Sequence, residues 1–166
     1  MSAIEGRAWV FGDDVSTDYL APGQFMKGGI EEIAAHCMEI VDPGFAGHVA
    51  PGDVVVAGNN FGMGSSREQA VQALLHLGIG SVIARSFARI FYRNGFNLGM
   101  RLLTCPAADR IAPGDIIRVD AAAGTVVDLT NGERLEAEPI PPHLMAMIAD
   151  GGLLPHLEKK LRGEAS

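Results

Sequence analysis

The sequence predicts an α/β fold with a parallel βαβ core and an additional β-hairpin. The first observation is a pair of β-branched runs, "GDVVVAG" at 52–58 and "SVIARS" at 81–86, each followed by a helical pattern. The second is an alternating stretch at 114–140 that turns through Asn131-Gly132, a pair typical of hairpins. Strands joined through a helix are almost always parallel, and such sheets bind ligands beyond the carboxyl ends of their strands.

The N-terminal third is predicted to contain a strand, a loop and a helix. "RAWVFG" at 7–12 is a short apolar run before the polar turn "DDVSTD", whose acidic side chains we expect to hold the backbone. "YLAPGQFMKGG" at 19–29 is bracketed by Pro22, Gly23, Gly28 and Gly29, which indicates an exposed loop free to move. "IEEIAAHCMEI" at 30–40 spaces its apolar residues along one helical face and is expected to end at "DPGF".

The remaining elements follow the same logic. "SSREQAVQALLHLG" and "FARIFYRNGFN" are the predicted crossover helices, and "RLLTCP" is a further strand. A C-terminal helical segment at about 142–162 begins after two prolines and is broken at Gly151-Gly152. At 166 residues the chain is long enough for one core and too short for two ordinary ones, so we expect a single domain over 1–166.

Composition excludes several functional classes. With 13 basic and 20 acidic side chains the net charge is −7, so nucleic acid is not an expected partner. The start of the sequence lacks the pattern of a signal peptide, and no apolar run reaches the ~20 residues that cross a bilayer, so we expect a cytoplasmic protein without membrane contact. Cys37 and Cys105 are far apart and the five histidines lack ligand spacing, so no metal site is expected in this chain.

The turn "NNFGMGSSRE" at 59–68 carries the chemistry. Ser65 and Glu68 fit the capping box, in which the serine accepts a hydrogen bond from the glutamate amide. Arg67, beside the positive end of a helix, also suits a carboxylate or phosphate. Residue types alone leave helix capping and anion binding equally supported. The turn lacks the last glycine of a dinucleotide fingerprint, and the sequence has no P-loop motif.

Longer stretches resemble the aconitase superfamily, and specifically the separate small subunits of isopropylmalate isomerase and homoaconitase. The likeness covers "GDDVSTDYLAPGQFMK", "NNFGMGSSREQA", "ARSFARIFYRNGFNLG" and "PPHLMAMIADGGLLPHL", nearly the whole chain. It implies a swivelling β/β/α domain of the aconitase type. It also implies a hydro-lyase that isomerises a branched hydroxy-dicarboxylic acid, 3-isopropylmalate to 2-isopropylmalate in leucine biosynthesis. A large partner subunit, in a heterodimer or heterotetramer, would carry a [4Fe–4S] cluster.

The resemblance also implies roles for single residues. Ser65 would be the base that removes a proton next to a carboxylate, while Ser66, Arg67 and Gly64 would bind a substrate carboxylate. The loop with Phe25, Met26 and Lys27 would read the group that differs between substrates.

Three alternatives stay open at this point. Phe25 and Met26 favour an apolar substituent, whereas Lys27 is either a solvated lysine or a partner for an extra carboxylate. The substrate could accordingly be homoaconitate or a methyl-substituted malate. A non-catalytic module that senses an anion or binds a partner is the alternative from another class.

Overall fold

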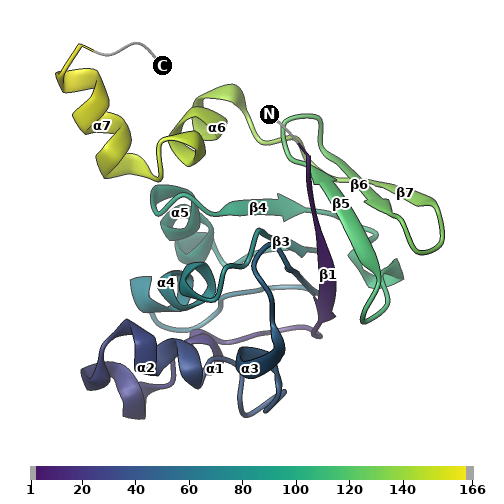
Figure 1. Ribbon diagram of the computed structural model, residues 1–166, viewed down its shortest axis with the longest axis horizontal. Coiled ribbons are helices and arrows are strands. Elements are labelled where there is room, and N and C mark those ends of the chain that lie inside the picture. The colour runs from purple at the N-terminus through teal and green to yellow at the C-terminus, as the bar shows by residue number, and fades with distance from the viewer. Residues whose placement is uncertain (1–2, 164–166) are drawn as a thin grey trace.

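Seven strands form one curled sheet in the computed structural model, which describes residues 3–163 (Figure 1). The strand order is β4-β3-β2-β1-β5-β6-β7; β1 to β4 run parallel, and β5 to β7 are antiparallel. The strands are β1 (Ile4–Val10), β2 (Val54–Ala57), β3 (Ser81–Ala84), β4 (Arg101–Thr104), β5 (Ile116–Asp120), β6 (Thr125–Asp128) and β7 (Glu133–Glu136). The mixed α/β class predicted from the sequence is confirmed.

Strand β1 joins the two parts of the sheet. Its first half pairs with β5, from Ile4 opposite Val119, and its second half pairs with β2, from Ala8 opposite Val54. The strand therefore begins at Ile4, earlier than the apolar run at 7–12 suggests. Residues 4–6 belong to the strand because they pair with β5, which lies far along the chain, and not because their own sequence pattern predicts a strand.

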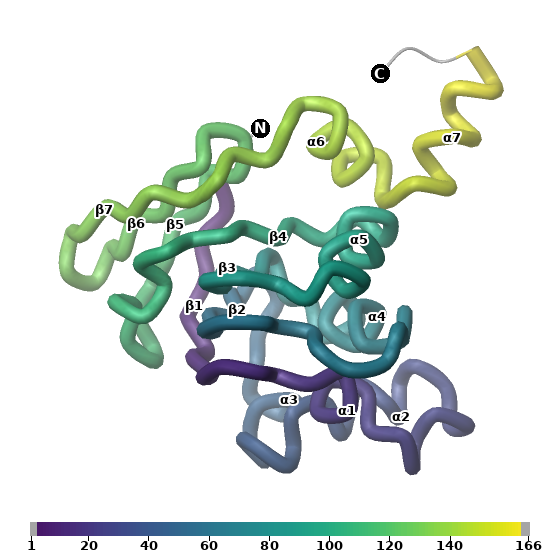
Figure 2. The backbone as a smooth tube through the Cα atoms, turned by 180° about the vertical axis from the view of Figure 1, so that it is seen from behind, coloured from purple at the N-terminus to yellow at the C-terminus, as the bar shows by residue number. Residues whose placement is uncertain are grey.

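The helices pack around the parallel strands. Helices α4 (Glu68–His76) and α5 (Arg89–Asn97) follow β2 and β3 as predicted, and every residue of those two strands is buried. The short helices α1 (Thr17–Leu20) and α2 (Ile30–Ala35) lie beside α4, and α3 (Phe45–His48) lies next to α2 and α1 on the side away from α4 (Figures 1 and 2). Two 3-10 helices, η1 (Gly23–Gly28) and η2 (Ala108–Arg110), complete the connections. Apolar side chains from all these layers form one core.

The C-terminal segment consists of α6 (Pro142–Ala149) and α7 (Leu153–Leu161), which are separated at Gly151-Gly152 as predicted. Helix α6 packs on α5, while α7 extends away from the sheet (Figures 1 and 2). At the joint between them, the Asp150 carboxylate accepts a hydrogen bond of 2.6 Å from Nδ1 of the buried His156. A polar contact therefore anchors α7.

Two local predictions were wrong, and a third was confirmed with an addition. Helix α2 ends at Ala35 rather than at residue 40, because Met38 has a positive φ of 63° and its N–H donates to the carbonyl of Tyr19 at 2.7 Å. The loop at 19–29 contains the end of α1 and the whole of η1 instead of an open chain. The predicted hairpin through Asn131-Gly132 exists between β6 and β7, but β5 adds a third strand to it.

Candidate functional site

The turn between β2 and α4 is held on both sides by the turns that follow β1 and β3. The N–H of Gly62 donates to Val15 at 2.7 Å, and the carbonyl of Met63 accepts from Thr17 at 2.8 Å. On the other side, the Phe61 N–H donates to Ser86 at 3.0 Å. The turn therefore lies at the carboxyl ends of three neighbouring parallel strands, where ligands bind in such sheets.

A carboxylate and a hydroxyl side chain reinforce the base of this turn. Asp13 accepts a hydrogen bond of 2.7 Å from the Asn59 N–H, which confirms the predicted backbone-holding role of that carboxylate. The Ser86 hydroxyl accepts one of 2.8 Å from the N–H of Asn60, whose φ is +62°. These contacts fix the first half of the turn before the residues with chemistry begin.

Both glycines of the turn are required by the space around them. Gly62 has a φ of +87°, and a Cβ there would lie 2.2 Å from Cγ of Phe91. Gly64 has a φ of +108°, and its Cβ would lie 3.0 Å from the hydroxyl oxygen of Thr17. That hydroxyl is buried and has no hydrogen-bond partner within residues 3–163. Glycine at 64 thus keeps the backbone open next to a buried polar atom.

Ser65 is not the cap of helix α4, so the capping-box prediction was wrong. The helix begins at Glu68, and its N-cap residue is Arg67, which has extended φ and ψ of −117° and 111° and makes no side-chain capping bond. Ser65 is exposed, and its hydroxyl forms no hydrogen bond to any residue that the structure describes. The hydroxyl is therefore free to contact a ligand.

Arg67 links the turn to helix α1. Its Nη1 lies 2.6 Å from a carboxylate oxygen of Asp18 and donates to the carbonyl of Ala21 at 3.0 Å. These contacts hold Arg67 out of a helical conformation, which explains why α4 starts late. The Asp18 side chain is 63% exposed, and an ion pair of this kind contributes only about 0–1 kcal/mol to stability. A ligand carboxylate could therefore replace Asp18 at little cost.

Asp18 is the site residue whose role the sequence analysis missed. It was grouped with Asp13 and Asp14 as an acid that holds the backbone, and its partner Arg67 is 49 positions further along the chain. The acidic residue inside "VSTDYL" could have suggested an ion pair, but nothing in that stretch indicates which cation forms it.

The predicted recognition loop lies on η1, directly after the carbonyl that Arg67 contacts. Phe25 and Met26 are half-buried against the core, whereas Lys27 is exposed and has no hydrogen bond or ion pair within the described part of the chain. The Phe25 ring stacks on His36. The structure thus brings the loop and the turn into one region through Arg67 and Ala21.

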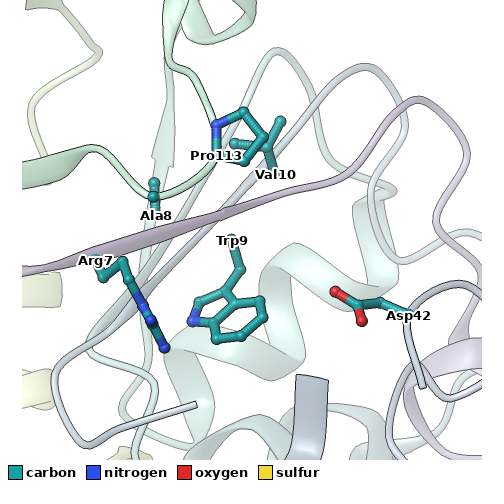
Figure 3. A pocket seen from close by; sticks show the side chains of 7 residues that line it. Arg7, Ala8, Trp9, Val10, Asp42 and Pro113 are labelled. Atoms are coloured by element: carbon teal, nitrogen blue, oxygen red, sulfur yellow. The ribbon is translucent and has the colours of Figure 1, made fainter. Parts of the chain in front are cut away.

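A separate hollow of about 310 Å³ surrounds Trp9 (Figure 3). The indole lies between Arg7 and Asp42; the Arg7 guanidinium is 4.7 Å from its ring centre. The indole N–H donates to Asp53 at 2.9 Å, and Arg7 donates to the carbonyl of His48 at 3.0 Å. Because these polar groups already bind one another, we do not assign a ligand to this hollow.

Comparisons with known proteins identify the family. The Aconitase C-terminal domain family matches residues 28–108. A 3-isopropylmalate dehydratase small subunit of Moorella thermoacetica is 45% identical, over 96% of this chain and 97% of that protein. The small subunit 1 of Methanopyrus kandleri is 49% identical, over 95% and 94%. The chain belongs to the 3-isopropylmalate dehydratase small-subunit family.

A solved structure supports the same assignment. The crystal structure of 3-isopropylmalate dehydratase from Methanocaldococcus jannaschii has a TM-score of 0.91 and 42% identity, covering 97% of this chain and 96% of that one. The resemblance drawn from the sequence motifs, and the aconitase-type fold it implied, are confirmed.

The described residues of this family member do not fit an iron–sulfur cluster. Between residues 3 and 163, no three His, Cys, Asp or Glu side chains are grouped so as to hold a metal ion. Cys37 and Cys105 are fully buried. Burial raises the pKa of Cys37 to about 12, so this thiol is not ionised to the thiolate that a metal requires.

No helix in residues 3–163 is long and apolar enough to cross a membrane.

Proposed function

We propose that this chain is the small subunit of a hydro-lyase that interconverts 3-isopropylmalate and 2-isopropylmalate in leucine biosynthesis. The observation that carries the proposal is the free Ser65 hydroxyl beside Arg67 on an exposed turn, in a chain whose relatives are named dehydratase small subunits. The large subunit would supply the [4Fe–4S] cluster. We place the complex in the cytoplasm as a heterodimer or a heterotetramer of the two subunits.

Ser65 acts in this proposal as the base. Its oxygen takes the proton from the carbon next to a substrate carboxylate and later returns a proton when water is added back. A serine hydroxyl is a very weak acid, so its ionised form needs a positive field. The N-terminus of α4 and the Arg67 guanidinium supply that field, and no hydrogen bond to a described residue competes for the oxygen.

Arg67, Ser66 and Gly64 bind the substrate carboxylate. The guanidinium offers a planar set of donors that matches a carboxylate, and in the absence of substrate Asp18 takes that place. Gly64 and Ser66 are exposed beside it, and Gly64 has no side chain to block the approach. When the substrate binds, its carboxylate therefore replaces that of Asp18 on Arg67. The guanidinium does not have to lose a full shell of water.

The loop on η1 contacts the group that distinguishes the substrates. Half-buried Phe25 and Met26 present apolar surface, which suits an isopropyl group. Lys27 favours a second candidate, a homoaconitate-type substrate with an extra carboxylate, because it is exposed and has no partner within residues 3–163. A methyl-substituted malate would use the same apolar surface and leave part of it uncovered.

Reconstitution tests the proposal. The purified chain is mixed with a cluster-loaded large subunit and supplied with 3-isopropylmalate, homoaconitate or a methyl-substituted malate. The alkene absorbance rises when a malate is dehydrated and falls when homoaconitate, itself an alkene, is hydrated. We expect the highest kcat/KM for 3-isopropylmalate and no turnover by either subunit alone. The highest value with homoaconitate would assign the second candidate. No turnover of any of the three, despite formation of a complex, would favour a non-catalytic binding module.

A further inference from the structure

We propose that His36 is a positioning residue for substrate selectivity, because it fixes the side chain of Phe25 in the recognition loop. The proposal rests on the function proposed above and names a residue that the sequence motifs did not indicate. His36 lies just beyond the end of α2, in a segment that the sequence predicted to be helical. Its role follows from what its ring contacts.

The contact between the two rings is a parallel stack. The centroids of Phe25 and His36 are 3.6 Å apart, and the ring planes differ by 5°. At the edge of the imidazole, Nδ1 of His36 lies 2.8 Å from a carboxylate oxygen of Glu39, which restricts rotation of the ring. Phe25 consequently rests on a ring that is itself held in place, and its own rotation is restricted.

The backbone explains how His36 reaches this position. The sequence pattern predicted that α2 continues to residue 40, with His36 inside the helix. Instead the chain leaves the helix after Ala35, and the N–H of Met38 donates to the carbonyl of Tyr19 in α1. Residues 36–38 are thereby tied to the helix that precedes the recognition loop.

The loop is thus fixed at two points. Arg67 contacts the carbonyl of Ala21 just before the loop begins, and His36 contacts Phe25 within it. Met26 is half-buried against the core, and Lys27 stays exposed. Of the loop residues expected to contact substrate, Phe25 is the one that stacks on a ring from outside the loop.

An ordinary stabilising stack and a positioning role make different predictions. A stack that only stabilises the fold lowers the melting temperature when it is removed, but it leaves the ratio of substrate preferences unchanged. A positioning residue changes that ratio, because a loosened Phe25 discriminates less between a large and a small apolar group. Aromatic pairs of this kind correspond to a change of about two- to tenfold in an equilibrium.

The decisive experiment compares variants in the reconstituted complex. For His36→Ala we expect the kcat/KM ratio between 3-isopropylmalate and a methyl-substituted malate to fall by about two- to tenfold, mainly through KM. His36→Phe keeps a stacking ring and is expected to retain the wild-type ratio. His143→Ala is the matched control, since His143 is exposed on α6 and forms no hydrogen bond or ion pair in the described structure. An unchanged ratio for His36→Ala, or an equal loss for His36→Phe, overturns the proposal.

A measurement on the isolated chain separates this proposal from the proposed function. A stacked phenyl ring shifts the imidazole protons of His36 upfield in the NMR spectrum relative to those of His143. We expect this shift in the wild-type chain and its loss in Phe25→Leu. A normal His36 resonance overturns the positioning role even if the complex is an active dehydratase. A complex inactive on every substrate overturns the proposed function while the stack is still observed.

Discussion

The glycines of the turn between β2 and α4 are constrained in two ways, by their backbone conformation and by the atoms that a Cβ would meet. Gly62 combines a positive φ with a neighbour that a Cβ would overlap, whereas Gly132, in the turn between β6 and β7, has a positive φ and open space around it. The two glycines allow the constraints to be separated by experiment.

We expect Gly62→Ala to lower the free energy of unfolding by about 2–4 kcal/mol, because left-handed strain is added to a clash with Phe91. The matched control Gly132→Ala should lose only about 1 kcal/mol, from strain alone. Urea unfolding monitored by circular dichroism measures both values. Equal losses for the two variants would show that the space beside Phe91 does not matter.

Cys37 is a buried thiol with a raised pKa, so it should be chemically inert in the folded chain. With a pKa of about 12, roughly one thiol in ten thousand is ionised at pH 8, and the side chain is fully buried. Iodoacetamide should therefore leave Cys37 unmodified in the native protein and modify it in guanidinium chloride, as read by peptide mass spectrometry. Rapid alkylation of the native chain would contradict the packing described here.

At the scale of elements, one carboxylate at the end of α6 contacts two side chains of α7. The hydrogen bond from His156, with a further contact from Lys159, holds the pKa of Asp150 below its usual value of 3.8. A carboxyl group with a lowered folded pKa stabilises the fold at pH values above 3.8. That contribution is lost as the pH falls through the lower folded pKa.

Asp150→Asn should consequently lower the melting temperature at pH 7, and lower it by less near pH 3, because the contribution of the carboxylate decreases as the pH falls below 3.8. Asp109→Asn is the control, because Asp109 is exposed and makes no hydrogen bond or ion pair within residues 3–163. Differential scanning calorimetry at both pH values measures the effect. A loss of the same size at pH 3 and pH 7 would rule out the carboxylate as its cause.

Elements were predictable where their determinants are local. The β-branched runs of β2 and β3 and the break at Gly151-Gly152 needed only neighbouring residues, and all were found. The end of α2 was missed because it depends on a bond from Met38 to Tyr19. The start of α4 was missed for the same reason, since Arg67 is held by Asp18 rather than by the helix. The candidate residues of the turn could be proposed as a group because they are adjacent in sequence, and their roles stay predictions. Partners from other segments, such as Asp18 and His36, could not be found from their neighbours.

At the scale of the whole molecule, we propose that residues 1–166 fold as a single unit. Strand β1 pairs with both parts of the sheet, and the chain after β7 returns to β4 through a hydrogen bond of 2.9 Å from the Glu138 N–H to Thr104. Trp9 fluorescence and far-ultraviolet circular dichroism should therefore report one unfolding transition with the same urea midpoint. Two separate midpoints would indicate independent parts.

The exposed position of the proposed site bears on the role of the proposed partner subunit. Ser65 and Ser66 are exposed at the ends of the parallel strands, and the residues of this chain that we assign to substrate binding lie on that surface and on η1. A base that is exposed to water is ineffective until a second surface covers it. In the proposed complex the large subunit provides that cover together with the cluster.

The most direct test of the central claim is the turnover of Ser65→Ala in the complex reconstituted with the large subunit. If Ser65 is the base, kcat for 3-isopropylmalate should fall by about 10²–10⁴-fold while KM changes little. Ser66→Ala, which removes a proposed contact to the substrate carboxylate, should instead raise KM. A Ser65→Ala complex that retains kcat to within about tenfold of the wild type would contradict the assignment of the base.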